Sequence, residues 1–333
     1  MTITVDAMGG DHAPRAVVAG AALAVHQGGV DLDDLVLVGD EAALGPIVRE
    51  ADLEGVRVVH APDVVGMNES AAAAVRTKPE SSIVLGMRHV AEGAGGAFVS
   101  AGNTGAVVAA ASLILGRLSG IARPGIAVPM PTREGPCVVI DVGANIYCKP
   151  KHMLQYGIMA AAYSHAVLGK EQPRIGLLNI GEEEGKGNPL IQEVHGLLQQ
   201  APIEYHGFIE GQDITNGKVD VVVCEGFVGN VILKVAEGMA SFVGRAVQSA
   251  FALHPPRDEV KEALGEAFRQ RDYAEYGGAP LLGVASPVLI GHGRSSPHAI
   301  MNMIRAAQSA VRHDVNQRIT DQLGQLSGDG SPT

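Results

Sequence analysis

Six stretches of the chain combine glycine with an amide, hydroxyl or charged side chain, a composition that suits the binding of an anion. Glycine permits positive φ and lets the backbone approach a ligand closely, and a following helix adds free N–H groups and a partial positive charge. Each stretch follows an expected strand: 5–11 (VDAMGGD), 100–106 (SAGNTGA), 141–145 (DVGAN), 179–188 (NIGEEEGKGN), 224–230 (CEGFVGN) and 291–296 (GHGRSS). Because ligands bind at the carboxyl ends of parallel strands, we expect the six loops to converge on one crevice.

The candidate phosphate-binding residues come from four of these loops. They offer backbone N–H groups, hydroxyls and a guanidinium that can hold phosphate bidentately. They are Asp6, Gly9, Gly10, Asn103, Thr104, Gly105, Gly185, Arg294 and Ser295. Asp6 could instead orient loop amides or hold a cation. Each loop taken alone also fits an ordinary capped turn between a strand and a helix, so the hypothesis depends on the whole set.

Three further side chains could take part in chemistry. Lys186 lies between two glycines at an expected helix start. The loop does not match a Walker A motif, because three residues separate Gly181 from Gly185-Lys186 where the motif has four. A solvated surface lysine is the alternative. His292 is a candidate general acid or base, with a structural histidine as the alternative. Cys148 has no visible histidine partner, so packing is favoured over a nucleophilic role.

Composition limits the class of protein. The 333 residues are 46% hydrophobic but only 4% aromatic and include 43 glycines, which favours a core of Val, Ile, Leu and Ala around a parallel sheet. Three cysteines without CxxC spacing argue against a zinc site or a disulfide framework. A net charge of −11 without a basic run argues against nucleic-acid binding. We expect no signal peptide, and the longest apolar run, 106–115, is too short to span a bilayer.

The elements that must position these loops alternate along the chain. Short β-branched runs are expected as strands at 3–5, 35–38, 56–60, 97–100, 137–142, 174–179, 203–208, 219–224 and 288–291. Amphipathic helices are expected at 14–26, 40–50, 103–115, 151–168, 188–200, 229–253, 257–272 and 297–312. This alternation predicts βαβ units in a three-layer α/β/α fold with a mainly parallel sheet. We expect one large catalytic domain over 1–326 and a flexible tail over 327–333.

One segment interrupts the alternation. Two helices in succession, separated by His254-Pro255-Pro256, predict a helical hairpin inserted at about 230–275. Each helix carries an apolar face, which we expect to pack against the core or against a second subunit. Contact of the hairpin with a membrane surface is the alternative.

Taken in order, the loops resemble those of the PlsX-type acyl-acyl carrier protein:phosphate acyltransferases. The matching stretches are VDAMGGDHAP, SAGNTGA, DVGAN followed by CKP, LLNIGEEEGKGN, DVVVCEGFVGNVILK, YGGAPLLG and GHGRSS, from Val5 to Ser296. Glu225 stands where the family usually has Asp, and Tyr147 where an acidic residue is common. The resemblance implies a homodimer without metal or cofactor, in a fold related to the isocitrate/isopropylmalate dehydrogenases and phosphotransacetylases.

The reaction implied is attack of inorganic phosphate on the thioester of a fatty acyl-acyl carrier protein. Its product, an acyl phosphate, serves phospholipid (phosphatidic acid) synthesis. Phosphate is itself a nucleophile, so the protein must position the reactants and stabilise an oxyanion. We expect phosphate at Lys186 and at the Asn103–Thr104 turn, the thioester carbonyl at Asn145 and Asn230, and His292 as proton donor to the leaving thiolate.

Binding of an acidic carrier to this acidic chain requires a local basic patch. The second hairpin helix supplies one in Arg257, Lys261 and Arg269. The location expected is cytoplasmic; peripheral contact with the inner face of the membrane, or contact with the membrane glycerol-3-phosphate acyltransferase, is the option left open. Three other hypotheses remain: a short-chain phosphotransacetylase acting on acyl-CoA, an NAD-dependent decarboxylating dehydrogenase of the same fold, and a non-enzymatic scaffold recruited to membranes.

Overall fold

A computed structural model describes residues 1–269 and 276–328. Its strands are β1 (Ile3–Asp6), β2 (Leu35–Gly39), β3 (Arg57–His60), β4 (Ala97–Ser100), β5 (Gly125–Thr132), β6 (Gly135–Ile140), β7 (Ile175–Leu178), β8 (Tyr205–Ile209), β9 (Val221–Val223), β10 (Ala279–Leu282) and β11 (Val288–Ile290). They form one 11-stranded sheet in the order β3-β2-β1-β4-β11-β10-β5-β6-β9-β7-β8. All neighbours are parallel except β11–β10, β10–β5 and β5–β6, which are antiparallel. The predicted mainly parallel sheet is confirmed.

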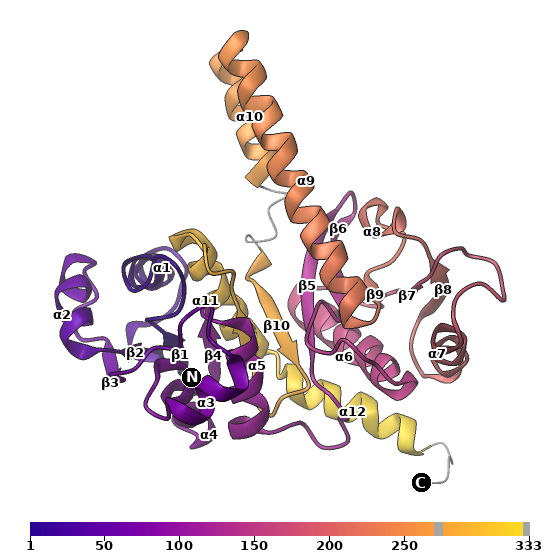
Figure 1. Cartoon of the computed structure of the whole chain (residues 1–333), viewed down its shortest axis with the longest axis horizontal. Coiled ribbons are helices and arrows are strands. Elements are labelled where there is room, and N and C mark those ends of the chain that lie inside the picture. The colour runs from indigo at the N-terminus through magenta and orange to yellow at the C-terminus, as the bar shows by residue number, and fades with distance from the viewer. Residues whose placement is uncertain (270–275, 329–333) are drawn as a thin grey trace.

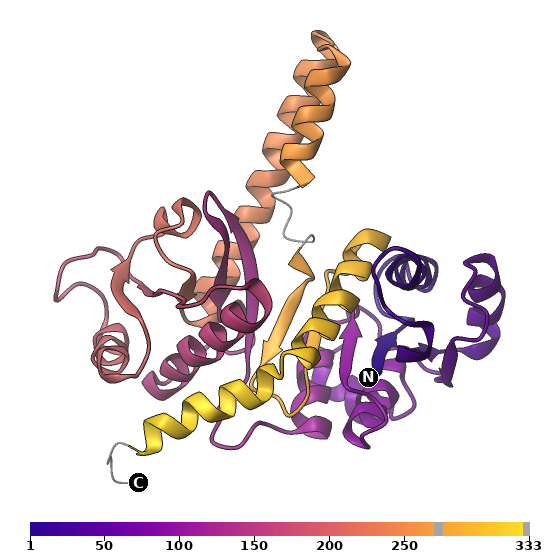
Figure 2. The same ribbon diagram turned by 180° about the vertical axis from the view of Figure 1, so that it is seen from behind.

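Helices cover both faces of the sheet (Figure 1 and Figure 2). They are α1 (Arg15–His26), α2 (Glu41–Glu50), α3 (Ala71–Thr77), α4 (Ser82–Ala91), α5 (Thr104–Ala110), α6 (Pro150–Leu168), α7 (Pro189–Gln200), α8 (Asp213–Asn216), α9 (Gly226–Leu253), α10 (Asp258–Arg269), α11 (Pro297–Arg312) and α12 (Val315–Gly328), with the short turns η1 (Leu32–Asp34) and η2 (Ala111–Leu115). Successive strand residues pack on opposite faces. On β4, for example, Phe98 joins the apolar cluster that includes α3, α4 and α5, and Val99 joins the cluster that includes α1 and α11.

The order of three strands decides where the predicted loops lie. β9 follows β7 in sequence but inserts between β6 and β7 in the sheet. Helix α9, which begins at the end of β9, therefore rises between the loop after β6 and the loop after β7 (Figure 1). This arrangement separates two of the loops that were expected to meet.

The hairpin of α9 and α10 projects from the body of the protein (Figure 1). Gly226 and Gly229 are the buried residues of α9. Apolar side chains along the hairpin are between 42% and 78% exposed: Phe227, Val231, Val235, Met239, Phe242, Val243, Leu253 and Val260. These side chains therefore do not pack against the core of the same chain, whereas Val228, Ile232, Leu233 and Ala236 near the start of α9 do.

Helix α9 also changes the expectation about membrane segments. Among the described residues it is the one helix long and apolar enough to cross a bilayer, with a mean hydropathy of 1.3 in a window of which 11% is buried. The prediction considered uninterrupted apolar runs such as 106–115, whereas the apolar residues of α9 are interrupted by Lys234, Glu237 and Arg245. Because α9 begins inside the protein body at Gly226, the part that projects is its distal portion.

The predicted hairpin and the predicted tail both extend beyond the residues that the structure describes. The hairpin is expected over about 230–275, of which residues 270–275 lie outside the described residues. The tail is expected over 327–333, and α12 extends through Gly328 into it. Residues 329–333 lie outside the described residues.

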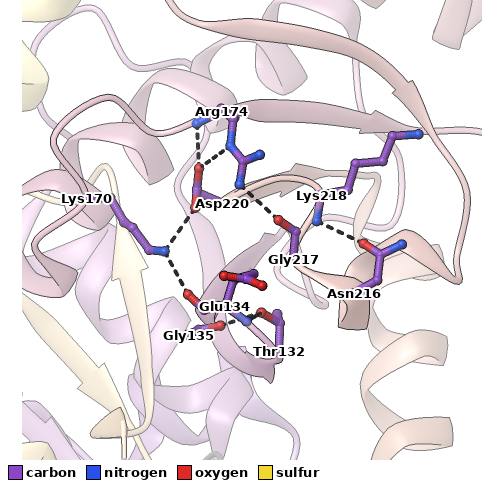
Figure 3. Close-up of polar contacts among 9 residues, drawn as sticks. All are labelled: Thr132, Glu134, Gly135, Lys170, Arg174, Asn216, Gly217, Lys218 and Asp220. Atoms are coloured by element: carbon purple, nitrogen blue, oxygen red, sulfur yellow. Dashed lines mark hydrogen bonds and ion pairs between the residues drawn. The ribbon is translucent and has the colours of Figure 1, made fainter.

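A charged cluster joins the amino ends of β6, β7 and β9, and Figure 3 shows its polar contacts. Asp220, which is 7% exposed, accepts hydrogen bonds from the backbone and the Nε of Arg174, both at 3.0 Å, and pairs with Lys170 Nζ at 3.1 Å. Burial opposes ionisation of Asp220, but these partners together lower its pKa. The cluster ties the starts of neighbouring strands together.

Candidate active site

Two buried aspartates end strands in the two halves of the sheet and organise the loops that follow. Asp6, at the end of β1, accepts hydrogen bonds from the Ser100 hydroxyl at 2.6 Å and the Met8 N–H at 3.1 Å. Burial raises its pKa, and these hydrogen bonds oppose the rise. Gly9 lies so close to the next loop that a Cβ would be 2.7 Å from the Gly102 nitrogen. Asp6 therefore orients loop amides, the first of the two roles considered for it.

Asp141 does the same at the end of β6. Its carboxylate accepts N–H groups from Ile126 at 3.0 Å, Ala144 at 2.9 Å and Asn145 at 2.7 Å. Burial raises the pKa of Asp141, and these hydrogen bonds oppose the rise. The start of α9 rests on this loop, where the Gly226 N–H donates to the Asn145 carbonyl at 3.1 Å. The Asp141 loop thus fixes the position of α9.

The side chain of Asn145 is occupied within the protein. Its Nδ2 donates to the Pro124 carbonyl at 2.7 Å and the Tyr156 hydroxyl at 2.8 Å, and lies 3.3 Å from Asp141 Oδ2. An amide nitrogen carries only two hydrogens. The predicted contact of Asn145 with a thioester carbonyl is therefore incompatible with this geometry, and Asn145 acts as a brace for the loop.

Asn103 is likewise committed to structure. Its Oδ1 accepts the Ala106 N–H at 3.1 Å and so caps α5. Its Nδ2 lies 3.1–3.2 Å from the carbonyls of Gly66, Met67 and Glu69. The side chain holds the 66–69 segment against α5, and Thr104 is left as the residue of this turn that faces a cavity.

A cavity of about 630 Å³ lies between the two halves of the sheet. It is lined by residues from the loops after β1, β4, β6 and β11 and from the first turns of α9, among them Asp11, Thr104, Gly143, Asn230, Lys234, Glu237, His292, Arg294 and Ser295. The structure therefore brings together Thr104, Asn230, His292, Arg294 and Ser295 of the predicted set. Gly10, with φ of +113°, and Gly105 support the walls without lining them.

The charges of the larger cavity are arranged in pairs. Lys234 Nζ lies 2.9 Å from Glu237 Oε2, and Arg294 Nε lies 3.9 Å from Asp11 Oδ2. The Arg294 side chain is 80% exposed and that of Lys234 is 55% exposed. Pairs this exposed are weak, so both cations can exchange their carboxylate for an anionic ligand.

The predicted proton donor has a defined local contact. His292 is exposed, and its Nδ1 accepts the Arg294 N–H at 3.2 Å. Because Nδ1 is occupied, Nε2 of His292 is the ring nitrogen that can contact a ligand. Ser296 caps α11 by accepting the Ala299 N–H at 3.2 Å, so the amino end of α11 opens onto the same cavity.

Lys186 lies outside the larger cavity. Its loop, with Gly185 at φ of +88°, is held by Asn179, whose Nδ2 donates to the carbonyls of Gly181 and Lys186, each at 3.1 Å. Asn179, Gly187 and Asn188 line a second cavity of about 590 Å³ on the other side of α9. The expectation that six loops converge on one crevice is wrong, because α9 divides them.

Cysteine and metal chemistry find little support. The Sγ of Cys148 lies 3.5 Å from the Asn145 carbonyl, and burial raises the pKa of the thiol, which disfavours a thiolate nucleophile. Burial also raises the pKa of Cys137, to about 12. Within residues 1–269 and 276–328, no group of three or more His, Cys, Asp or Glu side chains is arranged to hold a metal ion.

The sequence reasoning missed Lys234 and Glu237 as cavity residues. Lys234 lies in the stretch GNVILK, four residues after Asn230 and therefore on the same face of the helix. That spacing was the available signal. Of the predicted docking residues, Arg257 and Lys261 are exposed near the hairpin tip, whereas the side chain of Arg269 lies outside the described part of the chain.

Comparisons with known structures show the fold. The chain is similar to a phosphotransacetylase from Streptococcus pyogenes, with a TM-score of 0.65 and 15% identity over 93% of this chain and 94% of that one. A phosphotransacetylase from Staphylococcus aureus gives a TM-score of 0.62 with 16% identity over 92% and 94%. A 4-hydroxythreonine-4-phosphate dehydrogenase from Klebsiella pneumoniae gives 0.52 with 14% identity over 93% and 99%.

Comparisons of sequence are more specific. Residues 1–318 match the family model described as "Fatty acid synthesis protein". The chain is 44% identical to a phosphate acyltransferase from Geobacter sulfurreducens, over 97% of this chain and 94% of that protein. It is 45% identical to one from Desulfitobacterium hafniense, over 97% and 98%. With this identity over nearly its whole length, the chain belongs to the phosphate acyltransferase family of fatty acid synthesis proteins.

Proposed function

We propose that this chain transfers a fatty acyl group from an acyl carrier protein to inorganic phosphate and that the acyl phosphate serves phospholipid synthesis. Family membership supports the reaction class. The observation that carries the assignment is the larger cavity, because it gathers Asn230, His292, Arg294 and three hydroxyls at the carboxyl ends of the strands. Phosphorolysis needs such donors and no activated nucleophile.

Phosphate binds beside Arg294, Thr104 and Ser295 in this proposal. The guanidinium offers two parallel N–H donors to phosphate oxygens, and the amino end of α11 adds the partial positive charge of the helix. Lys234 contributes a second cation from α9. Because Lys186 lies on the other side of α9, the phosphate contact expected for it is replaced by these residues.

Asn230 donates its side-chain amide to the thioester carbonyl. A phosphate oxygen forms a bond to the carbonyl carbon, and the negative charge passes to the carbonyl oxygen. Collapse of this intermediate breaks the C–S bond and releases the carrier thiolate, which takes up the proton given up by the attacking phosphate, while Nε2 of His292 donates a hydrogen bond to the leaving sulfur. A charge-assisted hydrogen bond is worth roughly 1.5–3 kcal/mol, so one donor to the oxyanion changes the rate about tenfold to a hundredfold.

The test is the phosphate-dependent loss of palmitoyl-acyl carrier protein by the purified full-length chain. We expect turnover that requires phosphate, and Arg294→Ala to raise the KM for phosphate at least tenfold. Arg15→Ala is a matched control, since Arg15 forms an exposed ion pair with Glu50 and neither residue lines a cavity. Thioester loss without phosphate would sink the proposal, and turnover of acetyl-CoA alone would favour the short-chain phosphotransacetylase.

The hairpin supports a proposal about assembly. We infer that two chains pair through the exposed apolar face of α9, because single proteins rarely expose apolar patches of this extent. Phe242→Ser should then convert dimer to monomer in light scattering. Leu253→Ser, at the tip, should leave the dimer intact. Loss of binding to phosphatidylglycerol vesicles in both variants, with the oligomer unchanged, would instead assign the face to lipid.

The carrier protein docks on Arg257 and Lys261 in this proposal, with Arg269 as a further cation. Lys261 pairs with Asp258 at 2.9 Å, and both side chains are largely exposed, so an acidic partner can compete for the lysine. Asn230 lies 23 residues before Leu253, or about 35 Å along the helix at 1.5 Å per residue. That separation favours delivery to the cavity of a second subunit. Reversal of the charges of Arg257 and Lys261 should raise the KM for the carrier substrate and leave the KM for phosphate unchanged.

The remaining expectations are proposals of the same kind. We propose that residues 1–326 form one catalytic unit, cytoplasmic, with peripheral membrane contact at the hairpin. We also propose a fold relationship with the isocitrate/isopropylmalate dehydrogenases, supported by the likeness to the 4-hydroxythreonine-4-phosphate dehydrogenase. Fractionation of cells, with and without the Leu253→Ser change, tests the location.

A further inference from the structure

The smaller cavity has walls of a different character from those of the larger one. It measures about 590 Å³, within the range of roughly 300–1,000 Å³ that small-molecule pockets occupy. Its apolar lining comes from the end of β7, the start of α7 and one side of α9: Leu178, Ile180, Ile191, Val228 and Ile232. Such walls suit a hydrocarbon and offer little to an anion.

An apolar path joins the two cavities across the outer surface of α9. At about 100° per residue, Val228 and Ile232 lie on the side of the smaller cavity and Asn230 on the side of the larger one. Phe227 and Val231 lie between them on the solvent side, where they are 61% and 46% exposed. A chain bound at Asn230 can therefore reach the smaller cavity while it remains in contact with apolar side chains.

Lys186 adjoins in sequence the residues at the rim of the smaller cavity. Within the described residues, the side chain of Lys186 forms no ion pair, although Lys218 in the same region pairs with Glu182 and Asp213. Asn179 and Gly187 position the Lys186 backbone at the edge of the cavity.

We propose that the smaller cavity binds the hydrocarbon tail of the fatty acyl donor, with Phe227 and Val231 covering the stretch between the cavity and the thioester at Asn230. The proposal rests on the proposed function, because that function defines the ligand as a long acyl chain. Its consequence is chain-length selection. Each buried methylene favours binding by about fourfold, so the depth of this cavity sets the preference for long donors.

A fluorescence experiment tests the site without any turnover. The chain contains no tryptophan, so Ile180→Trp introduces a single reporter at the rim, where Ile180 is 82% exposed and the change leaves the core intact. A fatty acid with a bromine-labelled tail should quench this reporter at saturable concentration. Leu113→Trp is the matched control, because Leu113 is 61% exposed on η2 outside both cavities. Equal quenching of the two reporters, or none at Ile180→Trp, would overturn the proposal.

A kinetic experiment tests the consequence. Val228→Phe fills the cavity from α9, and we expect the preference for palmitoyl over octanoyl carrier protein, as kcat/KM, to fall about fifteenfold, the value for two buried methylenes. Leu113→Phe should keep the wild-type preference. Unchanged preference in Val228→Phe with normal octanoyl turnover would refute the site and leave the proposed function standing. If no donor reacts with phosphate, the proposed function fails, and the quenching experiment still decides whether the cavity binds a hydrocarbon tail.

Discussion

Gly229 lies in the first turn of α9, directly against the Asp141 loop. A Cβ added at this position would lie 2.0 Å from the Asp141 carbonyl oxygen and 2.9 Å from Cys224 Sγ. Helix propensity alone predicts that Gly229→Ala stabilises α9 by about 0.8–1.0 kcal/mol. We expect the opposite, because the obstructing atom belongs to the backbone of an anchored loop and cannot rotate away.

The size of the effect follows from the geometry. Forcing a methyl group into a packed site typically costs about 1–3 kcal/mol, and a backbone neighbour favours the upper end. At about 2.1 cal/mol/K per residue, the unfolding entropy of 333 residues is roughly 0.7 kcal/mol/K. A cost of about 3 kcal/mol therefore lowers Tm by about 4 °C. Asn230 is the next residue, and a displacement of about 1 Å at a positioned group reduces the rate roughly a hundredfold.

The same helix supplies the control. A Cβ added at Gly238 would have no neighbour within 4 Å, so Gly238→Ala should stabilise the protein slightly and leave the kinetics unchanged. Thermal unfolding and steady-state phosphorolysis of both variants measure the contrast. If Gly229→Ala matches Gly238→Ala in Tm and in kcat/KM, the contact between α9 and the Asp141 loop does not position Asn230, and the reasoning fails.

Three further predictions concern charges. Asp220→Asn should lower the free energy of unfolding by about 2 kcal/mol at neutral pH. In the folded protein Arg174 and Lys170 lower the pKa of Asp220 against the effect of burial. The stabilisation by Asp220 is therefore present above its unfolded pKa of about 3.9 and is lost as pH falls through its folded pKa. Urea unfolding from neutral to acid pH should show the two proteins converging, and a constant difference would contradict the assignment. Lys186→Ala should leave the KM for phosphate unchanged, because Lys186 does not line the larger cavity, whereas a rise for phosphate would move the phosphate site to the smaller cavity. Lys234→Gln should reduce kcat/KM for phosphate about tenfold or more with an unchanged Tm, since its ion pair with Glu237 is exposed.

Local patterns predicted most of the elements, and the two missed strands share a physical cause. β5 contains Pro129 and Pro131, and β10 contains Pro280. Proline is rare in the central strands of a sheet, so these segments were not predicted as strands. Both strands are antiparallel to their neighbours, at the place where the two parallel halves of the sheet meet. Helix α12 carried a readable signal in Val315, Ile319 and Leu323, spaced four residues apart and buried.

The site was less predictable because two of its determinants are not local. Asn103 and Asn145 have the composition of ligand-binding amides, and only the tertiary structure supplies the carbonyls that occupy them. The second determinant is the order of strands. The sequence places the Lys186 loop before the start of α9 but does not indicate that β9 inserts between β6 and β7. That insertion puts Lys186 and Asn230 on opposite sides of one helix.

Helix α9 separates two environments that the proposed reaction needs. A phosphate site requires donors and charge, whereas a fatty acyl site requires a dry apolar wall, and a single cavity lined by both would weaken each. Helix α9 supplies both environments from one element, with Asn230 and Lys234 on one side and Val228 and Ile232 on the other. Its anchorage on the Asp141 loop fixes both sides together, so a change at Gly229 should impair phosphate and donor binding at once. Separate effects on the two substrates would show that the helix does not couple them.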